Sequence, residues 1–358
     1  MNKIDFEIFP TTRYQGSKKK ILPWIYESAK DLEFATVLDA CGGSSCVSYL
    51  FKKMGKQVTY NDKLKFNYII GKSLIENQRV KFSDEDLQNL INNDLEVPDF
   101  IQRNFKEVYY LKSENKWLDK MSNGILNMNH YRGQTLEFKK AIAYYALFQA
   151  SLIKRPFNLF HRKNLTIRTN DVERNFGNKT TWDKTFYNHY RSFIKEANTL
   201  IFDSGVECRA LNQSVLEMDD VNYDLVYLDP PYLNKEGSNE TSNYLKCYHF
   251  LEGISNYNDW ENLIDFNSIN LRFRGTTEQN DFRKENIYET FERLIEKFRN
   301  STIILSYKKG GQPSINFLIE MMKRYKRKVY TKSIHYQYAL NRQIGDAKTN
   351  REVLIIGI

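Results

Sequence analysis

In the first part of the chain, short apolar runs alternate with stretches whose apolar residues recur at helical spacing. Each short run ends sharply at a turn or an acid. Residues 36–39 (TVLD) run into a glycine-rich turn, and residues 57–62 (QVTYND) end in an acid. Between them lies a stretch with helical spacing that stops near Gly55, and residues 21–29 show the same spacing. This succession of strand, glycine turn, helix, strand and acid predicts the first half of a doubly wound α/β sheet.

The middle of the chain has a different pattern, because polar, helix-prone sequence rich in basic and aromatic residues runs from about Ile75 to Gly205. Strand-like runs resume after it, in GVECRALNQSVLEM, LVYLDPPY, STIILSYKKGG, KRKVYTKSIHYQY and REVLIIGI. We therefore expect an α/β fold with a Rossmann-like sheet. Residues 1–74 and 206–358 would form the two parts of the sheet domain, and residues 75–205 a mostly helical insertion.

The charge of the chain favours a polyanionic partner, since 53 lysines and arginines against 44 acids give the 358 residues a net charge of +9. Nucleic acid is favoured over a membrane, because no apolar run approaches the roughly 18 residues of a membrane span. The start, MNKIDFEIFP, lacks the apolar core of a signal peptide, so we expect a cytoplasmic protein. The four cysteines show neither paired CxxC spacing nor nearby histidine clusters, which argues for reduced thiols and against a structural zinc site.

An acid, two prolines and an aromatic ring end the apolar run LVYLDPPY, residues 225–232. Two successive prolines forbid the strand from continuing, so Asp229 lies at a strand's carboxyl end, where open α/β sheets bind their ligands. A carboxylate beside a rigid proline carbonyl gives two acceptors that converge on one point, and they suit an amino group with two hydrogens. Tyr232 is then placed to stack on the ring that bears the amine. The alternative is a strand-terminating turn in which Asp229 caps a helix.

The glycine-rich turn after the first strand, DACGGS (residues 39–44), suits a nucleotide-like ligand, because paired glycines let backbone approach it. It does not match GxGxxG, and a tight strand-to-helix turn explains it equally well. Asp62, about 20 residues after the glycines, favours a ligand, since an acid there can accept hydrogen bonds from ribose hydroxyls. In the basic stretch RYQGSKKK, Lys18 could pair with a ligand carboxylate while Tyr14 packs nearby, although a solvated lysine run is the simpler interpretation.

Taken in order, RYQGSK, LDACGGSS, YND, a long insertion and LDPPY resemble the Dam-like adenine-specific DNA methyltransferases, from about Arg13 to Gly357. The resemblance implies S-adenosylmethionine as cofactor, transfer of its methyl group to the N6 amine of a flipped adenine in double-stranded DNA, and no metal. It also implies that residues 75–205 form the target-recognition domain between two parts of the catalytic domain. One departure is Asn212-Gln213-Ser214 in the strand before LDPPY, where family members often have an aspartate near the adenine of the cofactor.

The resemblance assigns roles to the residues that match the family's motifs. It implies cofactor contacts by Tyr14, Lys18, Asp39, Cys41, Gly42, Gly43, Asp62 and Gln213. It implies catalytic roles for Asp229, Pro230, Pro231 and Tyr232. The carboxylate of Asp229 and the carbonyl of Pro230 would accept both hydrogens of the amine, whose lone pair is otherwise delocalised into the ring. They would thereby stabilise the positive charge that develops on the nitrogen.

Basic residues crowd the second half of the insertion and predict the DNA-binding surface. The candidates there are Arg155, His161, Arg162, Lys163, Arg168, Arg174 and Lys179. NFGNKTTW (residues 175–182) predicts a tight hairpin that could enter the double helix, and Tyr248 and His249 lie in a predicted lid loop over the flipped base. The alternatives are a solvated basic face and, for His249, a structural histidine.

Other functions stay open on the sequence. Transfer to the 4-amino group of cytosine uses the same geometry, and an inactive methyltransferase fold could serve as a nucleic-acid-binding module. A nicotinamide enzyme would lack the third glycine of its motif and would leave DPPY unexplained. We expect the modification enzyme of a restriction system, with a separately acting cognate endonuclease as a candidate partner.

Overall fold

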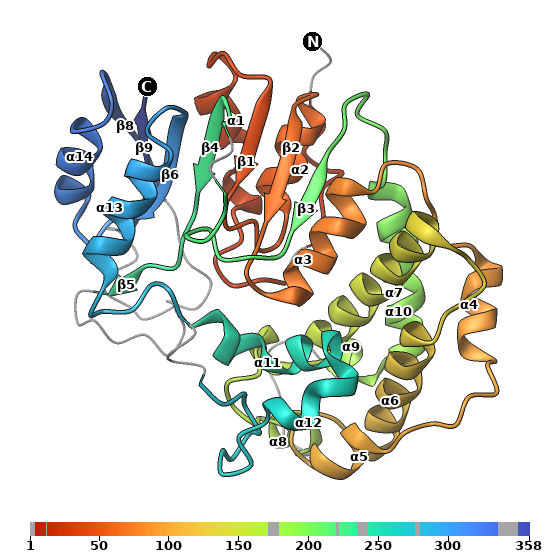
Figure 1. Ribbon diagram of the computed structural model, residues 1–358. Helices are drawn as coiled ribbons and strands as arrows, with labels where there is room; N and C mark the ends of the chain where they lie inside the picture. Colours follow the sequence, from red (N-terminus) through yellow and green to blue (C-terminus); the bar gives the residue numbers. More distant parts are fainter. Residues whose placement is uncertain are drawn as a thin grey trace.

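The computed structural model describes residues 4–11, 13–170, 179–219, 222–234, 243–275, 280–335 and 350–358. Within these residues, seven strands form one sheet in the order β3-β2-β1-β4-β6-β9-β8 (Figure 1). The strands are β1 (Thr36–Asp39), β2 (Gln57–Asn61), β3 (Arg209–Leu211), β4 (Leu225–Leu228), β6 (Thr302–Lys308), β8 (Val329–His335) and β9 (Arg351–Gly357). Neighbours pair in parallel except at β9, which is antiparallel to both β6 and β8.

The chain order of the sheet reverses between β1 and β4. From β1 the sheet extends through β2 to β3 on one side, and through β4 to β6 on the other. The register pairs Leu38 of β1 with Val226 of β4, so the carboxyl ends of these two strands lie next to each other. In open α/β sheets, this crevice beyond the strand ends is where ligands bind.

Alternate residues of each strand face two different cores, because successive side chains of a strand point to opposite faces. Val37 and Tyr227 belong to the larger core, whereas Leu38 and Val226 belong to the smaller one. The helices are α1 (Leu22–Ala29) and α2 (Cys46–Lys53) in the larger core, and α13 (Ile287–Lys297) and α14 (Ile315–Lys323) in the smaller. Burial on both faces explains why LVYL is apolar throughout.

Between β2 and β3 the chain forms a layer of helices, which lies below and to the right of the sheet in Figure 1. Its elements are α3 (Lys65–Gly71), the π-helical turn η2 (Lys72–Glu76), α4 (Asp84–Ile91), α5 (Phe100–Asn104), α6 (Lys112–Leu126), α7 (Gly133–Ile153), η3 (Pro156–Asn158), α8 (Thr166–Thr169), α9 (Lys179–Asp183) and α10 (Phe186–Leu200). Helix α7 packs against α10, α3 and α6. Contacts on several sides explain why KKAIAYYALFQASLI is apolar almost all the way round.

A segment from the second half of the chain joins this helical layer. It contains α11 (Tyr244–Ser255), the 3-10 turn η4 (Tyr257–Asp259) and α12 (Trp260–Leu263). The buried ring of Trp260 lies against Gly253, where a Cβ would be 1.8 Å from Cε2 of the ring, and its centroid is 5.0 Å from that of Phe105 of the insertion. Two short stretches complete the fold, namely the 3-10 turn η1 (Lys19–Ile21) and the pair β5 (Leu233–Asn234) and β7 (Gly311–Gln312).

The α/β fold class predicted from the sequence is confirmed, and two local predictions are wrong. The described part of the expected hairpin, residues 179–182, is helical and belongs to α9. Residues 244–250, expected within a lid loop, form the first turns of α11, whose N-cap Asn243 accepts the amide of Lys246. Within the described residues, no helix is both long enough and apolar enough to span a membrane.

Candidate active site

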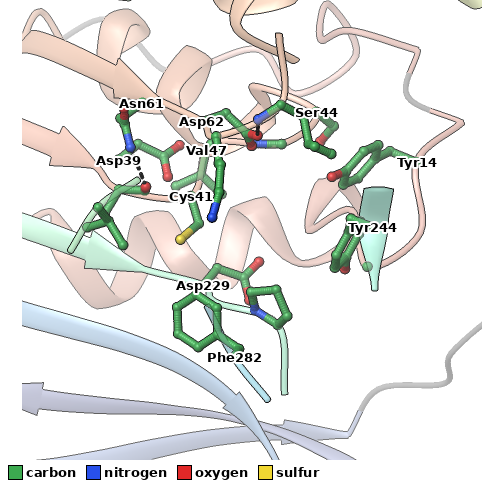
Figure 2. A pocket seen from close by; sticks show the side chains of 18 of the residues that line it. Tyr14, Asp39, Cys41, Ser44, Val47, Asn61, Asp62, Asp229, Tyr244 and Phe282 are labelled. Carbon is green, nitrogen blue, oxygen red and sulfur yellow. Dashed lines mark hydrogen bonds between the residues drawn. The ribbon is translucent and has the colours of Figure 1, made fainter. Parts of the chain in front are cut away.

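A hollow opens at the carboxyl ends of β1, β2 and β4, where the strand order reverses (Figure 2). Including its mouth it measures about 970 Å³, a size that suits a nucleotide-like ligand. All eight residues predicted to contact a cofactor line it, and so do Asp229 and Pro231. The carboxylates of Asp39, Asp62 and Asp229 therefore reach one space from the ends of three strands.

The turn after β1 is shaped by the packing beneath it. A Cβ on Gly42 would lie 2.1 Å from Cε2 of Tyr60, so glycine at this position makes room for the buried tyrosine ring. Gly43 has a left-handed φ of 48°, and its amide donates to Oδ2 of Asp62 at 2.9 Å. The paired glycines thus meet the demands of a tight strand-to-helix turn, and their backbone also lines the hollow.

The two acids at the ends of β1 and β2 are buried and accept hydrogen bonds from the protein. Asp39 accepts the hydroxyl of Ser48 at 2.6 Å, and burial, reinforced by the charge of Asp229, raises its pKa to about 7. Asp62 also accepts the amide of Leu64 at 2.8 Å, and burial raises its pKa to about 6. A cationic ligand, or one with hydroxyl donors, would stabilise the charged form of both carboxylates.

Asn61, the last residue of β2, ties the neighbouring strand ends together. Its Nδ2 donates to the carbonyls of Ala40 at 3.0 Å and Gln213 at 3.1 Å. Its Oδ1 is buried and has no hydrogen-bond partner among the residues that the structure describes. Because Asn61 lines the hollow, this acceptor fits a ligand that carries amino or hydroxyl hydrogens.

Lys18 lies beside the acid of LDPPY. Its Nζ is 2.9 Å from Oδ1 of Asp229 and 3.2 Å from Oε1 of Glu352, and its side chain is 3% exposed. Burial raises the pKa of Asp229 to about 6, with Lys18 opposing the shift and Glu352 adding to it. Lys18 was predicted to pair with a carboxylate of the ligand, but in the structure its ammonium pairs with two carboxylates of the protein.

Tyr14 forms one wall of the hollow and belongs to a stack of three tyrosines. Its ring lies 5.3 Å from that of Tyr244 and 4.9 Å from that of Tyr248, with interplanar angles of 13° and 7°. Its hydroxyl accepts Nδ2 of Asn67 at 3.0 Å. Tyr248 is fully buried, and its hydroxyl accepts the amide of Gln15 at 2.8 Å. The expectation that Tyr248 contacts DNA is therefore corrected, whereas Tyr244 one helical turn earlier lines the hollow (Figure 2).

The rest of LDPPY follows β4 directly. Pro230 is buried, whereas Pro231 and Tyr232 are half-buried. The Tyr232 ring packs edge to face on Tyr307 at 5.3 Å, and the Nζ of Lys308 lies 5.1 Å from its centroid. The ring of Tyr232 thus lies among residues of β6, beside the hollow rather than in its wall.

Sequence reasoning missed the segment that closes the hollow near Gln213. Asn280, Asp281 and Phe282 line the hollow there, although they follow LDPPY by some 50 residues. Asp281 accepts the hydroxyl of Ser214 at 2.9 Å and pairs with Lys63 at 2.8 Å. A carboxylate therefore stands beside the strand whose expected aspartate is replaced by Gln213, and no local motif marks it in the sequence.

Several predicted DNA contacts are internal to the protein. Arg155 is 2% exposed, and its guanidinium donates to the carbonyls of Leu159, Arg162 and Lys163 at 3.2, 2.6 and 2.7 Å. The Arg168 side chain is 5% exposed and pairs with Glu114 at 2.7 Å. These two arginines hold the insertion together, and the expectation that they contact DNA is corrected.

His249 is buried as well. Its Nε2 lies 2.8 Å from the hydroxyl of Tyr109 and 3.2 Å from the carbonyl of Phe160, and burial lowers its pKa to about 3. It is a neutral structural histidine, which was the alternative interpretation of this residue.

Other predicted DNA contacts lie at the surface. Arg162, Lys163 and Lys179 are exposed and His161 is half-buried. Arg174 lies outside the described residues. The amide of Phe160 donates to the carbonyl of Cys247 at 2.8 Å, so the loop that carries Arg162 and Lys163 is attached to α11, whose first turn lines the hollow.

A doubly wound sheet with a nucleotide-sized, acid-lined hollow at its switch point is typical of Rossmann-like enzymes. No group of three or more histidines, cysteines or acids that could hold a metal occurs among the described residues. The chain belongs to the D12 class of N6 adenine-specific DNA methyltransferases, because the sequence model of that family matches residues 14–262. It is thus an adenine-specific DNA methyltransferase, and of the two bases left open by the sequence the family favours adenine over cytosine.

The names of three curated relatives agree with this assignment. The Type II methyltransferase M2.HphI of Haemophilus parahaemolyticus is 28% identical over 328 residues, which cover 90% of each chain. The Type II methyltransferase M.FokI of Planomicrobium okeanokoites is 27% identical over 84% of this chain, and the modification methylase StsI of Streptococcus sanguinis is 25% identical over 87%. The chain spans about half the length of these last two, 45% and 46%.

Proposed function

We propose that the hollow binds S-adenosylmethionine and that Asp229 and Pro230 hold the N6 amine of an adenine that has been turned out of double-stranded DNA. The observation that carries the proposal is the convergence of Asp39, Asp62 and Asp229 on one space at the switch point of the sheet. The three acids stand at the ends of three strands that are separate in the sequence. A turn that happens to place an acid at one strand end would not explain why all three carboxylates reach the same space.

The residues around the hollow fit this cofactor. S-adenosylmethionine carries a sulfonium cation, an ammonium group, ribose hydroxyls and an adenine amine, and each of them favours an acceptor or a negative charge. Asp62 keeps lone pairs for ribose hydroxyls after it has accepted two backbone amides, and Asn61 Oδ1 is an unmet acceptor among the described residues. Phe282 and Asp281 are placed to contact an adenine ring and its amine.

The chemistry asked of the protein is to make a weak nucleophile attack. When bound, S-adenosylmethionine supplies an electrophilic methyl group. Asp229 and the Pro230 carbonyl accept the two hydrogens of the adenine amine, which localises the nitrogen lone pair and stabilises the positive charge that grows on nitrogen. One of these protons must leave after the nitrogen–carbon bond forms, and Asp229, with a pKa of about 6, can receive it only when it is ionised beforehand.

The target base reaches the acceptors only when it leaves the double helix, at a cost of a few kcal/mol. Tyr232 follows the prolines and would stack on the flipped base. Arg162, Lys163 and Lys179 would contact phosphates, because their side chains are exposed and the first two belong to the loop attached to α11.

We further propose that the protein is the modification enzyme of a restriction system and works in the cytoplasm. The relatives support the role in a restriction system, since two are Type II methyltransferases and one is a modification methylase. A separately acting endonuclease that cuts the same unmethylated sequence would be its functional counterpart.

The Asp229→Asn variant tests the proposed chemistry. It keeps the shape of the side chain but removes the charge, so transfer of labelled methyl groups to duplex DNA should fall by about 100-fold or more with little change in cofactor affinity. Asp219→Asn, at an exposed aspartate, is the matched control and should keep full activity. Digestion of the methylated DNA to nucleosides should give N6-methyl-2′-deoxyadenosine. A fully active Asp229→Asn variant, or label recovered in 4-methylcytosine, would refute the proposal.

A further inference from the structure

Glu352 is a fully buried carboxylate within the sheet. It belongs to β9 and pairs in register with Lys308 of β6 and Ile334 of β8, and its exposed fraction is 0%. Such a charge is costly unless charged or hydrogen-bonding partners compensate for its lost hydration. Its partners therefore indicate what the residue does.

Those partners lead directly to the active site. Oε1 of Glu352 accepts the hydroxyl of Ser306 at 2.9 Å and lies 3.2 Å from Nζ of Lys18. The same Nζ lies 2.9 Å from Oδ1 of Asp229. Glu352 and Asp229 thus share one ammonium, and both Lys18 and Ser306 are buried. The flexible side chain of Lys18 is thus held between two acids in the protein interior, where it has little conformational freedom.

We propose that Glu352 is a positioning residue for methyl transfer, which anchors Lys18 so that Lys18 fixes one carboxylate oxygen of Asp229 and leaves the other directed at the target amine. This inference rests on the proposed role of Asp229. Glu352 touches neither cofactor nor base and acts through Lys18.

The sharing of the ammonium has an electrostatic consequence as well. If the Lys18 ammonium were paired with Asp229 alone, it would draw the electron density of the carboxylate away from the target amine. Asp229 would then be a weaker hydrogen-bond acceptor. Glu352 takes part of that attraction, and its own negative charge raises the pKa of Asp229. Asp229 therefore stays a stronger acceptor than a simple lysine–aspartate pair would provide.

Other charged and titratable groups surround this cluster. They are Asp39 of β1, Cys41 in the turn after it, Tyr227 of β4, Tyr244 of α11 and Lys308 of β6. The Glu352 carboxylate counteracts the fall in the pKa of Lys308 that burial causes. Lys308 in turn lies over the ring of Tyr232, so the same carboxylate supports the cation next to the LDPPY tyrosine.

The Glu352→Gln variant removes the charge and keeps the shape of the side chain. The single-turnover rate of methyl transfer to a saturating duplex should fall by about 10- to 100-fold, while the Kd values for S-adenosylmethionine and DNA change by less than about 3-fold. The acid limb of the pH–rate profile should move to lower pH, because burial still raises the pKa of Asp229 but the negative charge of Glu352 no longer adds to the shift. The matched control is Glu320→Gln at an exposed glutamate of α14 paired with Lys323, which should change neither quantity.

Two further variants separate positioning from structural support. Glu352→Asp keeps the charge but shortens the reach to Lys18, so the rate should fall while the acid limb stays at the wild-type pH. If Glu352→Gln does not fold, Ser306→Ala removes one hydrogen bond from the carboxylate, and we expect a rate loss of about 2- to 5-fold without a change in cofactor affinity.

The outcomes distinguish this inference from the proposed function. A wild-type protein that does not methylate adenine, or an active Asp229→Asn variant, would remove the proposed function. An active wild type with an inactive Asp229→Asn, combined with an unchanged rate in Glu352→Gln or Ser306→Ala, would overturn the inference alone. So would a Glu352→Gln variant whose rate falls only in proportion to its folded fraction, with the acid limb unmoved.

Discussion

DNA binding should depend on the exposed cations of the loop after α7 and not on the buried ones. The double variant Arg162→Ala/Lys163→Ala removes two exposed side chains, and the Arg155 guanidinium still holds the carbonyls of both residues. Each phosphate contact contributes about 0.9 to the slope of log affinity against log salt concentration, so loss of two should reduce the slope by about 1.8. When the salt concentration rises fourfold, the affinity of the wild type should therefore fall about 12-fold more than that of the variant.

The measurement is fluorescence anisotropy of a labelled duplex titrated at several salt concentrations. Lys323→Ala/Arg324→Ala provides a matched control, because it also removes two exposed cations but from the end of α14, at the opposite edge of the molecule from the helical layer (Figure 1). The control should bind with nearly the wild-type slope. Thermal unfolding of both variants shows whether the fold has been kept.

Two results would refute the reasoning. An unchanged slope in the loop variant would mean that phosphates lie elsewhere on the protein, and an equal fall in the control would mean that only net charge matters. A lower affinity with the wild-type slope would point to a direct base contact, which changes affinity but not the number of displaced counterions.

Two further predictions concern the hollow itself. The single-turnover rate should fall about tenfold per pH unit below pH 6, because Asp229 must be ionised and burial raises its pKa to about 6; a rate that is flat down to pH 5 would contradict this. Gly42→Ala should lower the free energy of unfolding by about 1–3 kcal/mol, because the new Cβ would collide with one edge of the Tyr60 ring, whose other edge lies close to Gly71. Denaturant unfolding measures this loss, and an unchanged free energy of unfolding in Gly42→Ala would refute the predicted collision.

The sequence predicts best what short-range signals determine. The runs 36–39 and 225–228 coincide with β1 and β4, because a glycine turn ends the first and two prolines end the second. The residues at these ends then lie around one hollow because parallel strands of a sheet bring their carboxyl ends together. The alternation of strand-like and helical patterns predicted the α/β fold class, but the order of the strands in the sheet is seen only in the structure.

The density of basic residues in the sequence predicted poorly which side chains of the insertion are exposed at its surface. Arg155, Arg162 and Arg168 are equivalent in the sequence, yet the first and last are buried against carbonyls or Glu114. Whether a cation in a basic stretch faces solvent depends on partners that are distant in the chain. The same limitation hid Glu352, which looks like the polar start of an edge strand until Lys18 and Ser306 are found beside it.

Helix α11 links the loop that would meet DNA to the site that would modify it. Its Cys247 carbonyl holds the amide of Phe160, His249 contacts the carbonyl of the same residue, and Tyr244 faces the hollow. A displacement of the basic loop must therefore strain α11 or break buried hydrogen bonds that have no water to replace them. Since Tyr244 also stacks on Tyr14, contacts made by the loop with DNA have a short, packed route to the wall of the proposed cofactor site. This coupling gives recognition of the duplex a physical means to influence how the reactants are aligned.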